Sequence, residues 1–318
     1  MTGFFTTKAQ PGRTDGGVQL LGVLSGLAVA LIWSGWSVAT RFAVTTNLTP
    51  QDVTFLRFGV SALILWPILV RKGFAIQQIG IARLLVMVFG AGAPFMLLAS
   101  EGVRFAPASH IATLMIGLMP IWVALLSGVL FGEQFSPPQV IGLIVVGVGA
   151  LCIGSYSLLV NRSVGEWRGD LLFLLAGFCF ACFTIAQRRS GISPWHATAL
   201  VNVCSAILFS PIYFLWLTPS IFQAPLKELG FQIVAQGIAV AILGMFFYTE
   251  AVRRLGAPRA AIFGALAPAL AVLMGMAMLN ELPPWLTILG IAFVMIGVVM
   301  VVTGKRAPLV TAAERGAA

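Results

Sequence analysis

The sequence has 318 residues, of which 59% are hydrophobic and only 9% carry a charge. A soluble protein carries about 25% charged residues, so a water-soluble fold is excluded and a lipid bilayer is the expected solvent. The net charge of +9 comes from Lys and Arg that stand singly or in pairs between apolar runs. This pattern indicates membrane topology rather than nucleic-acid binding.

Ten apolar runs follow one another, each with about the 20 residues that a transmembrane helix needs. They cover 18–40, 52–70, 81–100, 108–131, 138–159, 170–187, 196–217, 231–252, 258–279 and 284–303. The breaks between them are mostly very short, so consecutive helices are expected to be antiparallel neighbours. The runs do not alternate between polar and apolar residues, which excludes a barrel. The predicted fold class is an all-α integral membrane protein with ten transmembrane helices.

Trp33 and Ser37 lie in the first run, beside the small residues Ser34 and Gly35. Such neighbours suit the wall of a cavity, and packing or lipid-facing aromatics are the alternative. Arg57 lies about two turns inside the second run, where a guanidinium is costly unless it reaches the interface or faces a cavity. Snorkelling to the outer interface is one interpretation. Binding of a substrate carboxylate through two parallel hydrogen bonds is the other.

The segment Gly90-Ala91-Gly92-Ala93-Pro94 weakens the third run. It predicts either local unwinding beside a cavity or close packing against a neighbouring helix. Pro120 and Pro268 fall in the middle of the fourth and ninth runs, where a Pro removes a backbone hydrogen bond and bends the helix. We interpret Pro94, Pro120 and Pro268 as hinges, and a static kink is the alternative for the last two.

Aromatic and lightly polar residues within the runs predict a cavity suited to a zwitterion with an apolar side chain. Every face of these helices is apolar, so helical phase does not identify the face that lines the cavity. The candidate substrate-binding residues are Trp33, Ser37, His110, Gln187, Asn202, Tyr213, Phe246 and Tyr248.

Acidic residues are few. Glu101 with Arg104, and Glu250 with Arg253 and Arg254, have the spacing of ion pairs at helix ends. Glu250 is the deepest acid and is therefore a candidate for a coupling role. No other acid lies clearly within a run, so the chain is expected to lack the buried carboxylate relay of a strongly proton-driven pump. Facilitated or weakly coupled transport is the resulting expectation.

The sequence contains an internal repeat. Four residues of the first half recur in the second at one common offset: Pro120, Glu133, Gly142 and Gly149 return as Pro268, Glu281, Gly290 and Gly297. Thr49-Pro50 corresponds to Ser193-Pro194, and Arg41 to Arg188, at slightly smaller offsets. Five helices per half is an odd number, so the second half enters the membrane from the opposite side and the repeat is inverted.

The predicted organisation is a tail (1–17), a first repeat (18–159), a second repeat (170–303) and a second tail (304–318). Lys and Arg concentrate in the segments that lie inside when the N-terminus is inside. Both termini are therefore expected in the cytoplasm of a bacterial-type inner membrane. Glu133 and Glu281 stand at tight turns, where we interpret them as caps of the next helix; a gate latch paired with a basic residue is the alternative.

Each half also ends in the same motif, which is a loop of small residues, a central Pro, a Glu turn and a Gly-spaced helix. Together with Leu31-Ile32-Trp33-Ser34-Gly35, Arg57-Phe58 and Gly169-Asp170-Leu171-Leu172, these motifs resemble the EamA-type drug/metabolite transporters over nearly the whole chain. Asn280 replaces the usual Gly before the second Glu, and Val201 stands where Arg57 stands in the first half. The resemblance implies a ten-helix exporter of small metabolites, often amino acids.

The sequence therefore predicts an exporter of small metabolites, above all aromatic or hydrophobic amino acids, that works by alternating access between the two repeats. We expect it to bind a small-molecule substrate within the lipid bilayer, to function as a monomer, and to use no nucleic acid, metal or cofactor. Two alternatives stay open. One is an importer, or an exporter of drugs or lipophilic cations that uses Glu250, and the other is an accessory subunit in lipid-carrier translocation. An enzyme is not expected, because no nucleophile–base or metal motif is present.

Overall fold

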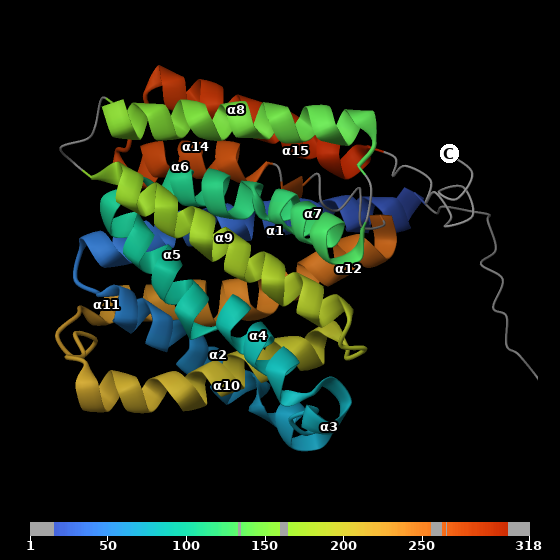
Figure 1. Ribbon diagram of the computed structural model, residues 1–318. Coiled ribbons are helices and arrows are strands. Elements are labelled where there is room, and N and C mark those ends of the chain that lie inside the picture. Colours follow the sequence, from blue (N-terminus) through green and yellow to red (C-terminus); the bar gives the residue numbers. More distant parts are fainter. Residues whose placement is uncertain (1–15, 133–134, 160–164, 256–262, 265, 305–318) are drawn as a thin grey trace, which may run out of the picture.

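The computed structural model describes residues 16–132, 135–159, 165–255, 263–264 and 266–304, and the described chain is helical (Figure 1). The helices of the first half are α1 (Gly16–Thr45), α2 (Pro50–Lys72), α3 (Ile76–Ile79), α4 (Ile81–Ala91), α5 (Ala93–Phe105), α6 (Ala108–His110), the π-helical η1 (Ile111–Gly117), α7 (Met119–Phe131) and α8 (Pro137–Leu159). Those of the second half are α9 (Glu166–Arg188), α10 (Pro194–Trp216), α11 (Leu226–Gln232), the π-helical η2 (Ile233–Gly244), α12 (Met245–Leu255), α14 (Ala267–Leu279) and α15 (Trp285–Thr303).

Nine helical stretches within the described residues are long and apolar enough to cross a membrane. They match nine of the ten predicted runs. The ninth run, 258–279, lies partly outside the described residues, and its described part is the shorter apolar helix α14. Large apolar side chains such as Leu63, Val129 and Leu215 are mostly exposed on the surface of the bundle. Lipid is the solvent that such a surface requires.

Two helices start in the same way because their sequences correspond. The Thr49 side chain accepts a hydrogen bond from the Asp52 backbone, and the Asp52 carboxylate accepts one from the Thr49 backbone, which together form a capping box ahead of α2. The Ser193 side chain caps α10 by accepting from the His196 backbone. Pro50 and Pro194 follow at the first helical position, where a Pro lacks only an N–H group that would have no helical partner.

Two of the spanning stretches, Ile81–Phe105 and Ala108–Phe131, change from one helix segment to the next near a proline, and a third proline stands at the start of α14. Gly92 separates α4 from α5, and Pro94 lies in the first turn of α5. Pro120 lies in the first turn of α7, after η1, and Pro268 in the first turn of α14. Pro120 thus lies in the middle of the helical stretch Ala108–Phe131, at the change from π-helix to α-helix. The interpretation of Pro94, Pro120 and Pro268 as hinges stays a prediction.

The bundle has a layered arrangement, with α8 and α15 side by side along one edge and α2 and α10 along the opposite edge (Figure 1). Between the edges, α1 packs against α12, α14 and η2, while α9 packs against α4, α5 and α7. The tight α8–α15 contact has a simple cause. A Cβ atom added at Gly142 would lie 2.8 Å from the Gly297 carbonyl oxygen, and one at Gly149 would lie 2.6 Å from the Gly290 oxygen. Glycines therefore let the two antiparallel backbones touch.

Candidate functional site

The two ends of the bundle carry different polar groups. We call the end at which α1 begins and α15 ends the tail end, and the opposite end the latch end. At the latch end, the α1 residue Arg41 pairs with Glu281 in the α14–α15 connection, with 2.8 Å between Nε and Oε1. Its Nη1 atom donates to the Val103 carbonyl of α5. The second Glu281 oxygen accepts from the Ala108 backbone N–H, at 3.1 Å. One carboxylate therefore ties α1 to the start of α6.

This arrangement corrects the interpretation of Glu281. It was expected to cap the next helix, α15, but its two oxygens are used by Arg41 and by the first residue of α6. The alternative, a latch paired with a basic residue, describes the geometry. Glu133, its counterpart in the first half, lies outside the described residues.

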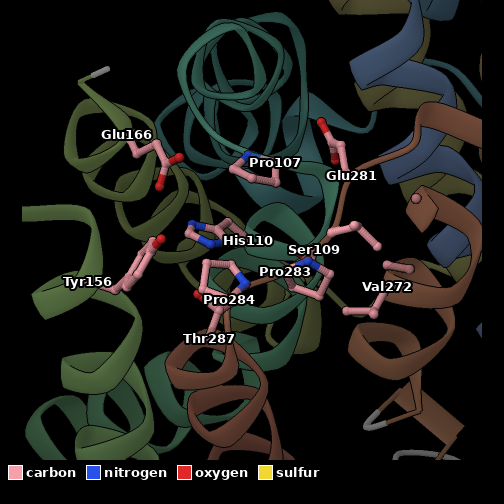
Figure 2. A pocket seen from close by; sticks show the side chains of 13 residues that line it. Pro107, Ser109, His110, Tyr156, Glu166, Val272, Glu281, Pro283, Pro284 and Thr287 are labelled. Atoms are coloured by element: carbon pink, nitrogen blue, oxygen red, sulfur yellow. The ribbon is translucent and has the colours of Figure 1, made fainter. Parts of the chain in front are cut away.

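A cavity of about 170 Å³ lies beside the latch. Figure 2 shows Glu166, Tyr156 and His110 gathered on one side of it and Glu281 with Val272 on the other. The wall is completed by a set of small, apolar and hydroxyl-bearing residues, which are Pro107, Ser109, Ala271, Gly275, Leu282, Pro283, Pro284 and Thr287.

His110, which lines this cavity, is paired with the buried acid Asp170. Its Nδ1 atom lies 2.7 Å from Oδ1 of Asp170 on α9, and the two residues are 1% and 5% exposed. The other oxygen, Asp170 Oδ2, is buried and has no hydrogen-bond partner among the described residues. Asp170 is the fifth residue of the spanning helix α9, and Glu166 its first. The expectation that no acid other than Glu250 lies within a span is therefore wrong.

Two further acids join the halves at the latch end. Asp52 accepts hydrogen bonds from the Tyr213 hydroxyl and from the Ser220 backbone. Glu228 of α11 accepts from the side chains of Thr46 and Asn47, each at 2.6 Å. These contacts fix the loop after α1 and the start of α2 to the second half.

Deeper in the bundle, an amide network connects α1 with α11 and η2. Trp36 Nε1 donates to Gln236 Oε1 at 2.8 Å, and Gln236 Nε2 donates to the Thr40 hydroxyl at 3.0 Å. Gln232 donates to the Ala39 carbonyl at 2.9 Å. The Arg57 guanidinium lies over the Trp36 ring, 5.3 Å from its centroid. Its Nε and Nη1 atoms are buried and have no hydrogen-bond partner among the described residues.

The predicted substrate-binding residues fall into three places. Trp33 and Tyr248 meet, with ring centroids 5.6 Å apart, and Ser37 donates to the Trp33 carbonyl. Asn202 and Tyr213 are buried between α10 and α2, where their side chains bond to Ser61 and Asp52. His110 lines the latch-end cavity. Phe246 is exposed and Gln187 is half-buried. The structure thus does not bring all eight residues together.

Sequence reasoning missed Arg41, Asp170, Gln232 and Gln236 as members of buried networks. Sequence spacing could not reveal them, because Arg41 and Glu281 are 240 positions apart and Trp36 and Gln236 are 200 apart. By contrast, the local pairs Glu101–Arg104 at 2.8 Å and Glu250–Arg254 at 2.5 Å confirm the i,i+3 and i,i+4 predictions.

An all-helical bundle of apolar spans, joined across its interior by buried polar contacts, defines a multi-pass membrane protein. Comparison with known families identifies it further. The EamA-like transporter family matches residues 20–155 and again residues 167–303, so the chain belongs to this family of membrane transporters.

Named relatives are similar to the chain over most of its length. The uncharacterized transporter YyaM of Bacillus subtilis is 22% identical over 87% of this chain and 92% of its own. The probable terminal-alkyne amino-acid exporter of Streptantibioticus cattleyicolor is 25% identical over 69% of this chain and 74% of its own. A solved crystal structure superposes with a TM-score of 0.59 at 18% identity, covering 89% of this chain and 95% of that one, which supports the fold alone.

Proposed function

We propose that the protein exports small metabolites, above all amino acids, from the cytoplasm across a bacterial-type inner membrane. The observation that carries this proposal is Arg57. A guanidinium with two buried nitrogens that have no hydrogen-bond partner among the described residues is costly, and a carboxylate can accept from such a nitrogen and compensate the charge. The Trp36 ring, which the guanidinium faces, attracts the cation and partly replaces its hydration. The relative from Streptantibioticus cattleyicolor, named a probable amino-acid exporter, supports the same substrate class.

Alternating access between two inverted repeats is the proposed mechanism. The helix contacts support it, because most contacts of a helix in one half have a counterpart between the corresponding helices of the other half. The contact of α1 with α12 corresponds to that of α9 with α4 and α5, and the contact of α1 with α14 corresponds to that of α9 with α7. The repeat relates α8 to α15 and α2 to α10, so the contacts α8–α15 and α2–α10 each join a helix to its own counterpart. A pseudo-two-fold axis of this kind lets the two ends open in turn.

The latch end is the proposed outer gate, with both termini in the cytoplasm and one chain sufficient for function. The sequence repeat relates Arg41 to Arg188 and Glu281 to Glu133. We propose that Arg188 and Glu133 supply the counterpart latch when the tail end closes. Glu133 lies outside the described residues, so this pair rests on the repeat alone.

The substrate class is tested by counterflow in proteoliposomes containing the full chain. Amino acids, nucleosides and lipophilic cations are each preloaded, and uptake of the matching radiolabelled compound is measured. We expect saturable amino-acid counterflow that falls about tenfold in Arg57→Gln, because one charge-assisted carboxylate contact is lost. Trp33→Ala should weaken it as well.

Arg104→Gln is the matched control, since Arg104 is exposed and its ion pair among the described residues is with its neighbour Glu101. Counterflow confined to lipophilic cations, or amino-acid counterflow unchanged in Arg57→Gln, would contradict the proposal.

A further inference from the structure

The pair His110–Asp170 is buried far more completely than any charged pair at the bundle surface. A carboxylate that is 5% exposed cannot rely on water for its charge, and its only described partner is the His110 ring. An ionised Asp170 accepts hydrogen bonds only, so the Nδ1 atom of His110 must carry the hydrogen between them. A neutral ring then leaves the negative charge uncompensated, which is expensive in a buried site. The geometry therefore offers a position at which one further proton would compensate a buried charge.

A proton can bind to the free ring nitrogen of His110. With Nδ1 committed to Asp170, the acceptor of a neutral His110 is Nε2, and the His110 side chain lines the latch-end cavity. The cavity supplies polar surface through Glu166 and Tyr156 (Figure 2). Such a cavity can hold the water through which a proton arrives. A proton that enters from the solution and passes along the water adds to the Nε2 lone pair, and the imidazole becomes an imidazolium.

Other titratable groups around His110 can be assigned. From α9 come Asp170 and Glu166, and from α8 comes Tyr156. Glu281, on the opposite wall, is already neutralised by Arg41 of α1.

The position of the pair connects it to the gate. Ala108, which donates its N–H to the latch residue Glu281, is two residues before His110 on α6. The π-helical segment η1 begins at Ile111, immediately after His110. A charge change at His110 therefore acts on the same short helix that the latch holds, next to a segment of the type that often marks functional sites.

We propose that His110 and Asp170 form the proton-coupling site of the transporter, which takes a proton from the latch-end cavity and exchanges it for the exported metabolite. This inference rests on the proposed function, because coupling requires a transported substrate. It replaces the facilitated or weakly coupled transport expected from the sequence with proton antiport.

The site is first tested without any substrate. The chain has two histidines, His110 and His196, so nitrogen NMR of histidine-labelled protein gives two titration curves, and His110→Asn assigns them. We expect the His110 signals to show uptake of a proton, and this response to change in Asp170→Asn, where the anionic partner is gone, while the response of His196 stays the same. A His110 ring that stays neutral between about pH 5 and 9 overturns the proposal.

Coupling is then tested in proteoliposomes with the amino acid that gives the strongest counterflow. An acid lumen should drive uptake of that amino acid as protons leave. In Asp170→Asn we expect this accumulation to fall about tenfold, while counterflow, which needs no net proton movement, stays within about twofold. The retained counterflow also shows that the variant folds. Glu101→Gln, an exposed carboxylate at the same end, is the matched control and should change neither rate.

The outcomes separate the two proposals. Amino-acid counterflow in the wild type with no response to the pH gradient overturns the coupling site and leaves the proposed function standing. Absence of amino-acid counterflow overturns the proposed function and the coupling that depends on it, even where the NMR titration finds the proton.

Discussion

The two ends of the bundle are held by different kinds of contact. At the latch end, two described ion pairs are buried or half-buried and join elements far apart in sequence, namely Arg41–Glu281 and His110–Asp170. At the tail end, the described contacts that cross between elements end on carbonyl or hydroxyl oxygens and include no ion pair. Gln139 donates to the Val301 carbonyl at 3.2 Å, and His196 Nε2 lies 2.8 Å from the Gly73 carbonyl oxygen. Glu250 pairs with Arg254 on its own helix. Among the described residues, the ion pairs that cross between elements therefore lie at the latch end.

The largest loss of stability is expected from Asp170→Ala. Removing one partner of a buried ion pair typically costs about 3–5 kcal/mol, because the other partner loses its compensation. Chemical unfolding in detergent measures the loss. The double variant Asp170→Ala with His110→Ala should recover part of it, since the orphaned imidazole is then absent too. A loss below about 1 kcal/mol contradicts a buried charged pair.

Glu281→Gln should have the next largest effect. The variant weakens the bond from Arg41 and the bond from the Ala108 N–H, and charge-assisted bonds of this kind contribute about 1.5–3 kcal/mol. We expect the latch end to open more often. A Cys at Ser109, which is 6% exposed, should then react faster with a membrane-impermeant maleimide in a background without the four native cysteines. Unchanged labelling contradicts the gate.

At the tail end, Glu250→Gln sharpens the contrast. Its pair with Arg254 lies within one helix, and such i,i+4 pairs stabilise by about 0.3–0.5 kcal/mol. Loss of this pair should lower stability by about that amount, and amino-acid transport should persist. Loss of lipophilic-cation efflux in this variant, with amino-acid transport absent, would instead revive Glu250 as the cation-binding group.

The smallest effect is expected from Arg104→Gln, at the same end as the latch. Arg104 and Glu101 are both on α5 and well exposed, so the pair should contribute less than about 0.5 kcal/mol. Melting temperature in detergent measures the change. If this variant destabilises the protein as much as Glu281→Gln does, the stability contribution of a pair depends on its place at the latch end. It then does not depend on whether the pair joins two different elements.

Local features of the fold were predictable from the sequence, and the long-range ones were not. Apolar length gave the spans, and i,i+3 or i,i+4 spacing gave the pairs of Glu101 and Glu250. Asp170 resembled an interfacial acid at the start of a helix, because its partner His110 stands 60 positions away. Helices that are apolar on every side carry no phase signal, so the networks of Arg41 and Gln236 required the three-dimensional packing.

The glycine contact along the α8–α15 edge has a consequence for how such a chain can arise. Gly142 meets Gly297, and Gly149 meets Gly290, while the sequence repeat relates Gly142 to Gly290 and Gly149 to Gly297. Each half therefore offers its counterpart the surface it receives in return, which is the self-complementary property of a two-fold homodimer interface. A gene encoding one half, inserted in both orientations, would already carry this joint. Fusion of two copies then needs no new interface along this edge, only a linker.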